Sequence, residues 1–282
     1  MATRVTHGLI ATRTFSSRVR PIAVALVVFL LAAFTTLGLS APPAYAFFDA
    51  LFEELEISVG QSVHQQLVRE HGVVNLPRPQ QAFLERIMND LTAVSDRPDL
   101  TYHITVLNAQ EINAFAAPGG YLYVTLPFLR FVESTEELAG VLGHEVAHVA
   151  RRHGMNTLQR ELGTALILQL LFGRNDDRTL QTVVGIVMAR IRSGWSQEQE
   201  FEADHYGARY AAAAGYGVEG LLTFLRRMES LQGGGDDLLT RWFSTHPPTG
   251  DRIARLEGLA RELTVQARSE PIPPLPAAWR RR

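Results

Sequence analysis

The residues best suited to chemistry are two histidines and a glutamate in the segment His144-Glu145-Val146-Ala147-His148. Helix positions four residues apart lie on one face, so both imidazoles can reach a single metal ion while Glu145 lies beside it. Two histidine nitrogens and a carboxylate suit zinc and leave one position open for water. Two incidental surface histidines are the weaker interpretation, because the apolar residues of this segment indicate a buried helix, where unpaired polar groups are costly.

A third, acidic ligand is expected from a later helix. The segment Glu200-Phe201-Glu202-Ala203-Asp204 begins 52 residues after His148, and its first and last residues share a helix face. Glu200 would bind the ion. Asp204, one turn on, would accept the N–H of a zinc-bound histidine and fix its tautomer.

Helices and a small sheet must position these residues. The segment 134–154 begins with the capping box Ser134-Thr135-Glu136-Glu137 and is expected to form the helix that carries both histidines. Apolar and polar residues alternate over 102–106 and 121–125, as in strands, and Pro118-Gly119-Gly120 is typical of a turn. A further helix is expected at 47–74, before Pro77 and Pro79, which end it. Other helices are expected at 80–94, 164–172, 180–191, 196–213, 218–231 and 251–263.

Four segments together resemble the HtpX- and BepA-like zinc metallopeptidases, which are relatives of the CAAX prenyl endopeptidases. They are Asn113 to Gly120, the HEVAH helix with Ala150 and His153 after it, Ser196 to Asp204, and Ser244-Thr245-His246-Pro247-Pro248. The resemblance covers residues 55–263. It implies an α+β, mainly helical gluzincin fold with a small mixed sheet, one of whose edge strands borders the cleft.

The resemblance also implies a set of site residues. The zinc ligands would be His144, His148 and Glu200, with Glu145 as the catalytic base and Asp204 behind the ligands. One zinc ion is expected per chain. The ion would acidify a water molecule, and Glu145 would take its proton and later return it to the leaving amine. An extended substrate would add as a strand along residues 113–125, and its contacts are expected at Asn113, Ala114, Phe115, Gly119 and Gly120.

His246 has two possible roles. In exported relatives a histidine in this Thr-His-Pro loop can approach the zinc as a fourth ligand and block the water position. Alternatively, His246, Tyr206 or Tyr210 stabilises the oxyanion of the tetrahedral intermediate, and spacing does not choose among these three. Arg252 matches an arginine of the family and is expected to tie the loop to the body.

Two further histidines are not expected to reach the ion. His153 is five residues after His148 in the same expected helix, which places it off the zinc face. His205 follows Asp204 and points about 100° away from it on the helix. His205 is interpreted as a packing or surface residue.

Composition excludes several classes of function. All 27 basic residues are arginines, so Schiff-base chemistry and a phosphate-binding P-loop lysine are ruled out. The chain has no cysteine, which excludes thiol nucleophiles, disulfides and thiolate metal sites. The net charge of −2 gives no reason to expect nucleic-acid binding.

The first 46 residues have the pattern of a signal peptide. Four arginines and no acid precede the uncharged stretch 22–39, and Ala44-Tyr45-Ala46 then offers a cleavage site. Cleavage after Ala46 would leave a mature protein of net charge −6 in the periplasm or outside the cell. The alternative is an uncleaved anchor, because 22–39 is near the lower limit of a membrane span.

Residues 47–268 are expected to form the metallopeptidase domain, and 269–282 an extended, exposed tail rich in proline and arginine. Within the domain, the two apolar pieces 164–172 and 180–191 flank a polar tip and are each too short to span a bilayer. We expect a helical hairpin packed on the core. The alternative is a hairpin that contacts a membrane or an envelope-assembly partner.

Two functions follow from these residues. The first is an exported zinc endopeptidase that cuts unfolded or misassembled envelope proteins. The second is a chaperone or assembly factor that holds extended chains on its edge strand and rarely cuts them, although a protein that only holds chains has no need of Glu145. A zinc-stabilised structural protein is disfavoured by the open water position.

Overall fold

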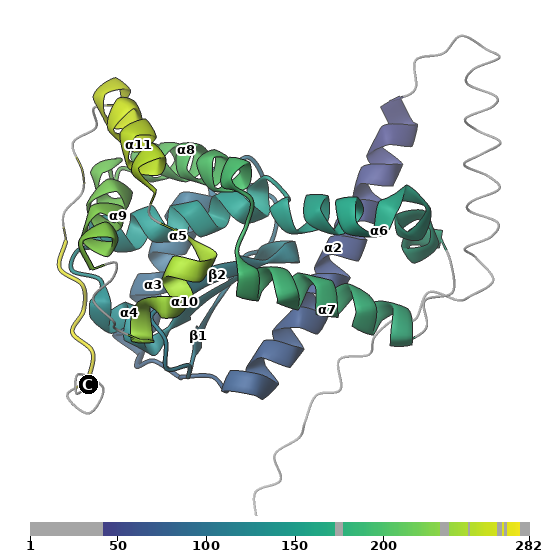
Figure 1. The fold of residues 1–282 in the computed structure, drawn as a ribbon, viewed down its shortest axis with the longest axis horizontal. Coiled ribbons are helices and arrows are strands. Elements are labelled where there is room, and N and C mark those ends of the chain that lie inside the picture. Colours follow the sequence, from purple (N-terminus) through teal and green to yellow (C-terminus); the bar gives the residue numbers. More distant parts are fainter. Residues whose placement is uncertain are drawn as a thin grey trace, which may run out of the picture.

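The computed structural model describes residues 42–172, 177–231, 237–247, 249–263, 267 and 270–276. The predicted signal peptide therefore lies almost wholly outside the described residues. Figure 1 shows the arrangement of the helices and strands. In chain order they are α2 (Pro42–His71), α3 (Arg78–Thr92), β1 (His103–Leu107), β2 (Ala114–Ala117), the 3-10 turn η1 (Pro118–Gly120), β3 (Tyr121–Thr125), α4 (Leu126–Phe131), α5 (Thr135–Ala150), α6 (His153–Phe172), α7 (Asp177–Ser193), α8 (Gln197–Ala213), α9 (Glu219–Leu231), α10 (Asp237–Thr245) and α11 (Gly250–Glu262).

The sheet has three strands in the order β1-β3-β2. β1 pairs with β3 in parallel, and β2 pairs with β3 antiparallel, so the sheet is mixed. β2 and β3 are joined by the turn η1, where Gly119 and Gly120 have φ angles of 75° and 92° that side chains strongly disfavour. The predicted fold class, α+β and mainly helical with a small mixed sheet, is confirmed.

Helix α5 runs through the middle of the body (Figure 1) and contacts α8, α9, α3 and the edge strand β2. Its start is capped by Ser134, whose hydroxyl accepts the N–H of Glu137 at 3.1 Å. Nearly every residue of α5 is buried, including all three residues of chemical interest. The helix that carries the histidines is therefore a core element, as its apolar residues predicted.

Two glycines let α5 and α8 approach closely. A Cβ atom on Gly143 would come within 2.8 Å of the carbonyl oxygen of Gly207, and one on Gly207 would come within 2.6 Å of the backbone nitrogen of His144. Contact between the two backbones brings the histidine side chains of α5 within reach of the carboxylates of α8.

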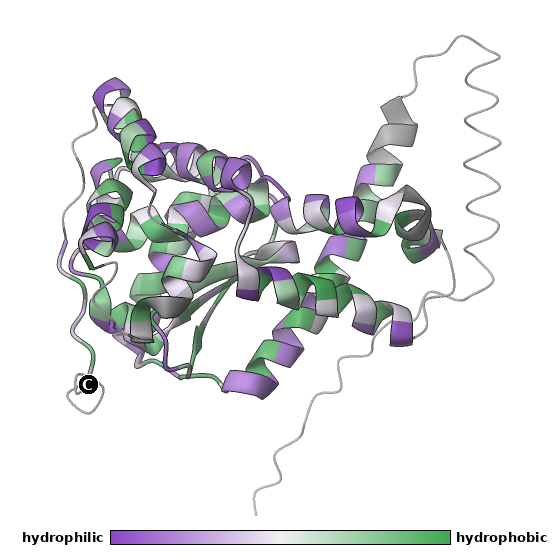
Figure 2. Cartoon of the chain, in the orientation of Figure 1, coloured by the Kyte–Doolittle hydropathy of each residue, from purple (hydrophilic) through white to green (hydrophobic). Residues whose placement is uncertain are grey.

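A second apolar cluster joins α2 to the α6–α7 pair, and green, hydrophobic segments mark this region in Figure 2. The predicted piece 164–172 is the C-terminal part of α6, after a break at Gly163, and 180–191 lies within α7. Residues 173–176 of the predicted tip lie outside the described residues. The pair packs on α2, as a hairpin on the core should. Within the described residues, no helix is both long and apolar enough to cross a membrane.

Several predicted boundaries were wrong. α2 ends at His71 and not at the prolines, because Gly72 adopts a φ of 72° and its N–H bonds back to the Val68 carbonyl at 2.9 Å. α5 ends at Ala150 and not at Gly154, because Arg152 has a φ of 54° and interrupts the helix. The short helices α4 and α10 were not predicted.

The tail is extended over 271–276, and Pro271 and Pro274 are exposed as predicted, but the apolar side chains between and after them are not. Ile272 and Leu275 are half-buried against the main core, in a groove that α3 and α5 line. The Glu270 carboxylate pairs with Arg86 at 2.6 Å, and its carbonyl accepts a bond from the Thr135 hydroxyl. Residues 277–282 lie outside the described residues.

Candidate metal centre

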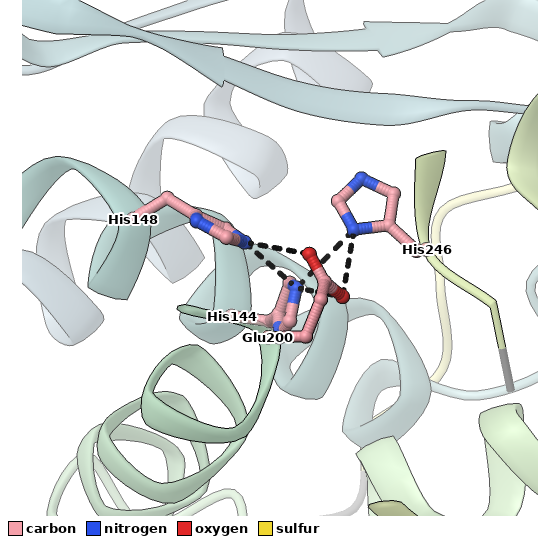
Figure 3. A group of neighbouring side chains, drawn as sticks. All are labelled: His144, His148, Glu200 and His246. Carbon is pink, nitrogen blue, oxygen red and sulfur yellow. Dashed lines mark hydrogen bonds and ion pairs between the residues drawn. The ribbon is translucent and has the colours of Figure 1, made fainter. Parts of the chain in front are cut away.

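Four side chains converge at the contact between α5 and α8. One ligand atom from each of His144, His148, Glu200 and His246 lies within 4.8 Å of the other three. The Nε2 atoms of His144 and His148 are 3.1 Å apart, and they lie 3.5 and 3.4 Å from the two oxygens of Glu200. Figure 3 shows His148 and His246 approaching Glu200 from opposite sides. The structure thus brings together the three residues predicted as ligands, with His246 as a fourth.

The charges of this site call for a cation. Glu145, Glu200 and Asp204 are each at most 2% exposed, and Arg252 is the buried arginine among them. With all three carboxylates ionised and the imidazoles neutral, as metal ligands must be, a net charge of −2 remains, and a buried charge needs a partner or a metal ion. Both oxygens of Glu145 and one of Glu200 accept no hydrogen bond from the described residues. The donor set and its charge therefore fit a divalent ion.

On one side of the site, Asp204 supports His144. The Nδ1 atom of His144 lies 3.0 Å from the Asp204 carboxylate, as predicted for a residue behind the ligands. Arg252 holds the same carboxylate through two bonds of 2.7 Å and also pairs with Glu200 at 2.9 Å. Burial by itself lowers the pKa of His144, but the contacts with Asp204 and Glu200 outweigh it and raise the pKa to about 10. The surroundings of His144 therefore strongly favour a positive charge.

On the other side, His148 is supported by His153, which sequence reasoning placed off the zinc face. The two Nδ1 atoms are 2.7 Å apart, and Nε2 of His153 lies 3.3 Å from the Glu202 carboxylate. Trp195 stacks on the His148 ring with centroids 4.9 Å apart. Burial lowers the pKa of His148 well below its usual value, which favours the neutral imidazole that a metal requires.

His246 follows α10 directly and lies beside Glu145. Its Nδ1 is 3.4 Å from Nε2 of His144, and its Nε2 is 3.6 Å from a Glu145 oxygen. Its ring packs against Trp242, and Arg252 donates to the Pro247 carbonyl at 3.1 Å. Arg252 thus ties the loop to the body, as expected, and also reaches Glu200 and Asp204 of α8.

The other side chains considered for the site have partners elsewhere. The Tyr210 hydroxyl accepts the Asp96 N–H at 3.3 Å, and the guanidinium of Arg151 lies over the Tyr206 ring at 4.3 Å. His205 is exposed and contacts the Tyr206 ring edge-on, as a surface residue would. Of the three oxyanion candidates, His246 is the one with a contact to Glu145 in the structure.

Of the predicted substrate edge 113–125, only the part in β2 is an outer strand of the sheet, and it contacts α5. The prediction was wrong for 121–125, because these residues form the central strand β3, which is paired on both sides. Ala114 and Phe115 of β2 are buried, and so are Asn113, Gly119 and Gly120. The Oδ1 atom of Asn113 accepts no hydrogen bond from the described residues. A small cavity of about 10 Å³ lies where the end of β2 meets His148 and Trp195. The edge is thus next to the site but covered in this conformation.

The sequence profile described as "Peptidase family M48" matches residues 78–260. The chain is 26% identical over 221 residues to "Mitochondrial metalloendopeptidase OMA1" of Schizosaccharomyces pombe, a match that covers 78% of this chain and 65% of that protein. It is 28% identical to "Protease HtpX homolog" of Salinibacter ruber, over 69% of this chain and 80% of that protein. With "Beta-barrel assembly-enhancing protease" of Escherichia coli the identity is 24%, over 74% of this chain and 44% of that protein.

The chain therefore spans less than two thirds of the length of several curated relatives that it matches, including 32% of an OMA1 protein of Arabidopsis thaliana. The profile match contains α3, the sheet, α5, α8 and nearly all of α11. It thus includes every element that contributes a side chain to the metal centre.

Proposed function

Because the chain belongs to peptidase family M48, we propose that it is a zinc-dependent endopeptidase of the cell envelope that cuts unfolded or misassembled proteins. One observation carries this proposal: two imidazoles and a carboxylate converge beside Glu145, whose buried oxygens have no hydrogen-bond partner among the described residues. Relatives named as metalloendopeptidases and as a beta-barrel assembly-enhancing protease support it.

In this proposal His144, His148 and Glu200 hold one zinc ion. The set suits zinc over magnesium or calcium, because those ions prefer oxygen ligands and this set is rich in nitrogen. When bound, zinc would polarise the scissile carbonyl and make a water molecule more acidic. Asp204 would keep the His144 imidazole in the tautomer that offers Nε2 to the ion.

Glu145 is the proton carrier of the proposed reaction. Burial raises the pKa of this carboxyl, and a raised pKa brings a carboxylate closer to the value at which a general base works best near neutral pH. Glu145 takes a proton from the attacking water and passes it to the amine of the departing peptide, so it ends the cycle as it began. The enclosed site excludes bulk water from this transfer.

For His246 the contacts favour the role of a fourth, inhibitory ligand. Its Nδ1 is one of the four clustered ligand atoms, and an imidazole and a reacting water cannot occupy one tetrahedral position. If so, the resting enzyme is latent and His246→Ala cleaves faster than the parent. If His246 instead stabilises the oxyanion, its loss slows cleavage by about 10² to 10³. An unchanged rate on one unfolded substrate would contradict both roles.

The substrate is expected to bind as an extended strand along β2, with Asn113, Ala114, Phe115, Gly119 and Gly120 as its contacts. An unfolded chain supplies such a segment, whereas a folded protein does not. The same edge supports the second candidate, a chaperone or assembly factor that holds chains with proteolysis latent. A catalytic variant distinguishes the two, because holding does not need Glu145.

Export with cleavage after Ala46 remains a prediction, as does contact of residues 164–191 with a membrane or assembly partner. Ala46 lies within the first two turns of α2. N-terminal sequencing of the protein isolated from cells tests the cleavage. A mature protein that starts at Met1 or Ala2 would establish an anchor instead.

The decisive experiment is digestion of casein by the purified protein with and without a chelator, beside Glu145→Gln. The parent should cut, and the chelated parent should not. The Glu145→Gln variant should retain zinc and stability but lose about 10² to 10⁴ in rate, the usual cost of losing a general base. Digestion at the parental rate by this variant would end the peptidase proposal, and suppressed aggregation of casein without cleavage would favour the chaperone.

A further inference from the structure

His153 lies in a position that its sequence spacing does not predict. α5 ends at Ala150, and α6 begins at His153 after a break at Arg152, whose φ is 54°. After this break the His153 ring lies behind His148, where its centroid is 4.8 Å from the His148 centroid and only 1% of the residue is exposed. The Gln199 amide donates to the His153 carbonyl at 3.2 Å and holds the start of α6 on α8.

The contacts of the two rings fix the direction of their hydrogen bonds once a metal ion binds. Nε2 of His148 faces the cluster, so its Nδ1 must carry the proton. That proton points at Nδ1 of His153, 2.7 Å away, which must then accept it. The proton of His153 is consequently on Nε2, where the Glu202 carboxylate at 3.3 Å accepts it. Glu202 is itself held by Arg151 at 2.7 Å.

We propose that His153 is a positioning residue for the metal centre, a neutral acceptor that holds His148 in its zinc-binding tautomer and orientation. The inference rests on the proposed metal site and adds a residue to it that touches no reacting atom. The chain His148, His153, Glu202 does for one ligand what Asp204 does directly for the other. Residues in such places typically change metal affinity by about 10- to 100-fold when they are lost.

The test measures zinc affinity by competition between the metal-free protein and a chelator, in the full chain. His153→Leu fills the space without an acceptor and should weaken zinc binding by about 10- to 100-fold. His153→Asn places its amide oxygen near the position of Nδ1, so it should restore binding to within about threefold of the parent. His205→Ala, on the exposed face of α8, is the control and should leave the affinity unchanged.

Denaturant unfolding of the metal-free proteins separates positioning from packing. A positioning role predicts that His153→Leu loses zinc affinity even where its metal-free stability matches the parent, whereas a packing role predicts that the two fall together. If His153→Leu does not fold, His153→Gln replaces it, because the longer side chain carries its amide past the Nδ1 position. Asn should then bind zinc more tightly than Gln.

Parental zinc affinity in His153→Leu, or equal affinities in the Asn and Gln variants, would overturn the inference while leaving the metal site intact. A parent that binds no zinc would overturn the proposed function as well. The titration of the His153 variants thus tests the inference, and the titration of the parent tests the proposed function.

Discussion

The two imidazoles that α5 offers to the ion are supported in opposite ways. His144 faces the interior, where Asp204 and Arg252 are each 2% exposed and form a two-bonded ion pair behind it. His148 faces the α5–α6 turn, where the neutral His153 passes its hydrogen bond to Glu202, whose side chain is 37% exposed. One support is a buried charge pair and the other is a neutral relay that ends near solvent.

The difference teaches where each support is vulnerable. A buried ion pair contributes strongly only while both partners remain, since removal of one strands the other in a medium that solvates it poorly. A relay that ends in a partly exposed carboxylate is screened by water and salt. Loss of the inner support should therefore lower the stability of the fold, whereas loss of the outer support should lower only the affinity for the metal.

The largest effect is expected from the ligands themselves, where the two sides should not differ. His144→Ala, His148→Ala and Glu200→Ala should each reduce the zinc content from about one ion per chain to nearly none, because each removes one of only about four ligands. Metal analysis of the purified variants measures this. Full zinc in Glu200→Ala would place the third ligand elsewhere, although Glu202 and Asp204 already hold His153 and Arg252.

The next effect separates the two sides. Arg252→Met removes the guanidinium that pairs with Asp204 and Glu200, and the metal-free protein should lose about 3 to 5 kcal/mol of unfolding free energy. Arg151→Met is the matched control on the outer side, where the paired side chains are 34–41% exposed, and it should cost at most about 1 kcal/mol. Denaturant unfolding measures both. Equal losses would contradict the distinction between a buried and a screened support.

The sequence alone predicted the inner side of the centre better than the outer side. Spacing of four residues put His144 and His148 on one face, and the same spacing put Glu200 and Asp204 on another helix. That the two helices meet was supplied by the family resemblance. Physically, the meeting depends on Gly143 and Gly207, whose backbones touch across more than sixty residues of sequence.

The outer side was missed because its cause is not local. Neither Arg151 nor Arg152 is a helix breaker, yet Arg152 takes a left-handed φ that costs roughly 1 to 2 kcal/mol. Acidic residues of α2 pair with its guanidinium, Asp49 at 2.9 Å and Glu56 at 3.5 Å, and offset that cost. The side chains that hold this break lie about a hundred positions away in the sequence, so the sequence of the helix does not indicate that the helix ends there. The docked tail escaped prediction for the same reason, since its groove exists only after folding.

A smaller effect is expected from the glycine contact between α5 and α8. Gly207→Ala would place a methyl group 2.6 Å from the His144 nitrogen, so the helices must separate, at about 1 to 3 kcal/mol. Zinc affinity should fall together with stability, because the ligands lie on both helices. Gly185→Ala in α7 meets nothing within 4 Å and should instead stabilise the protein by about 0.5 to 1 kcal/mol. Thermal unfolding with and without zinc compares them, and a harmless Gly207→Ala would show that the α5–α8 contact is looser than described.

The smallest effect is expected at the outer end of the relay. Glu202→Gln keeps an amide oxygen that can accept from His153 and removes only the negative charge, so zinc affinity should fall by less than about tenfold, below the range for loss of a direct support. The residual effect should shrink further as salt is raised, because the charge is partly exposed. Asp204→Asn is the matched change on the inner side. It leaves Arg252 without its buried carboxylate partner, so it should cost more affinity and resist added salt. Chelator competition at low and high salt measures both variants. If Glu202→Gln were the more damaging of the two, or if salt acted equally on both, the contrast between the supports would not hold.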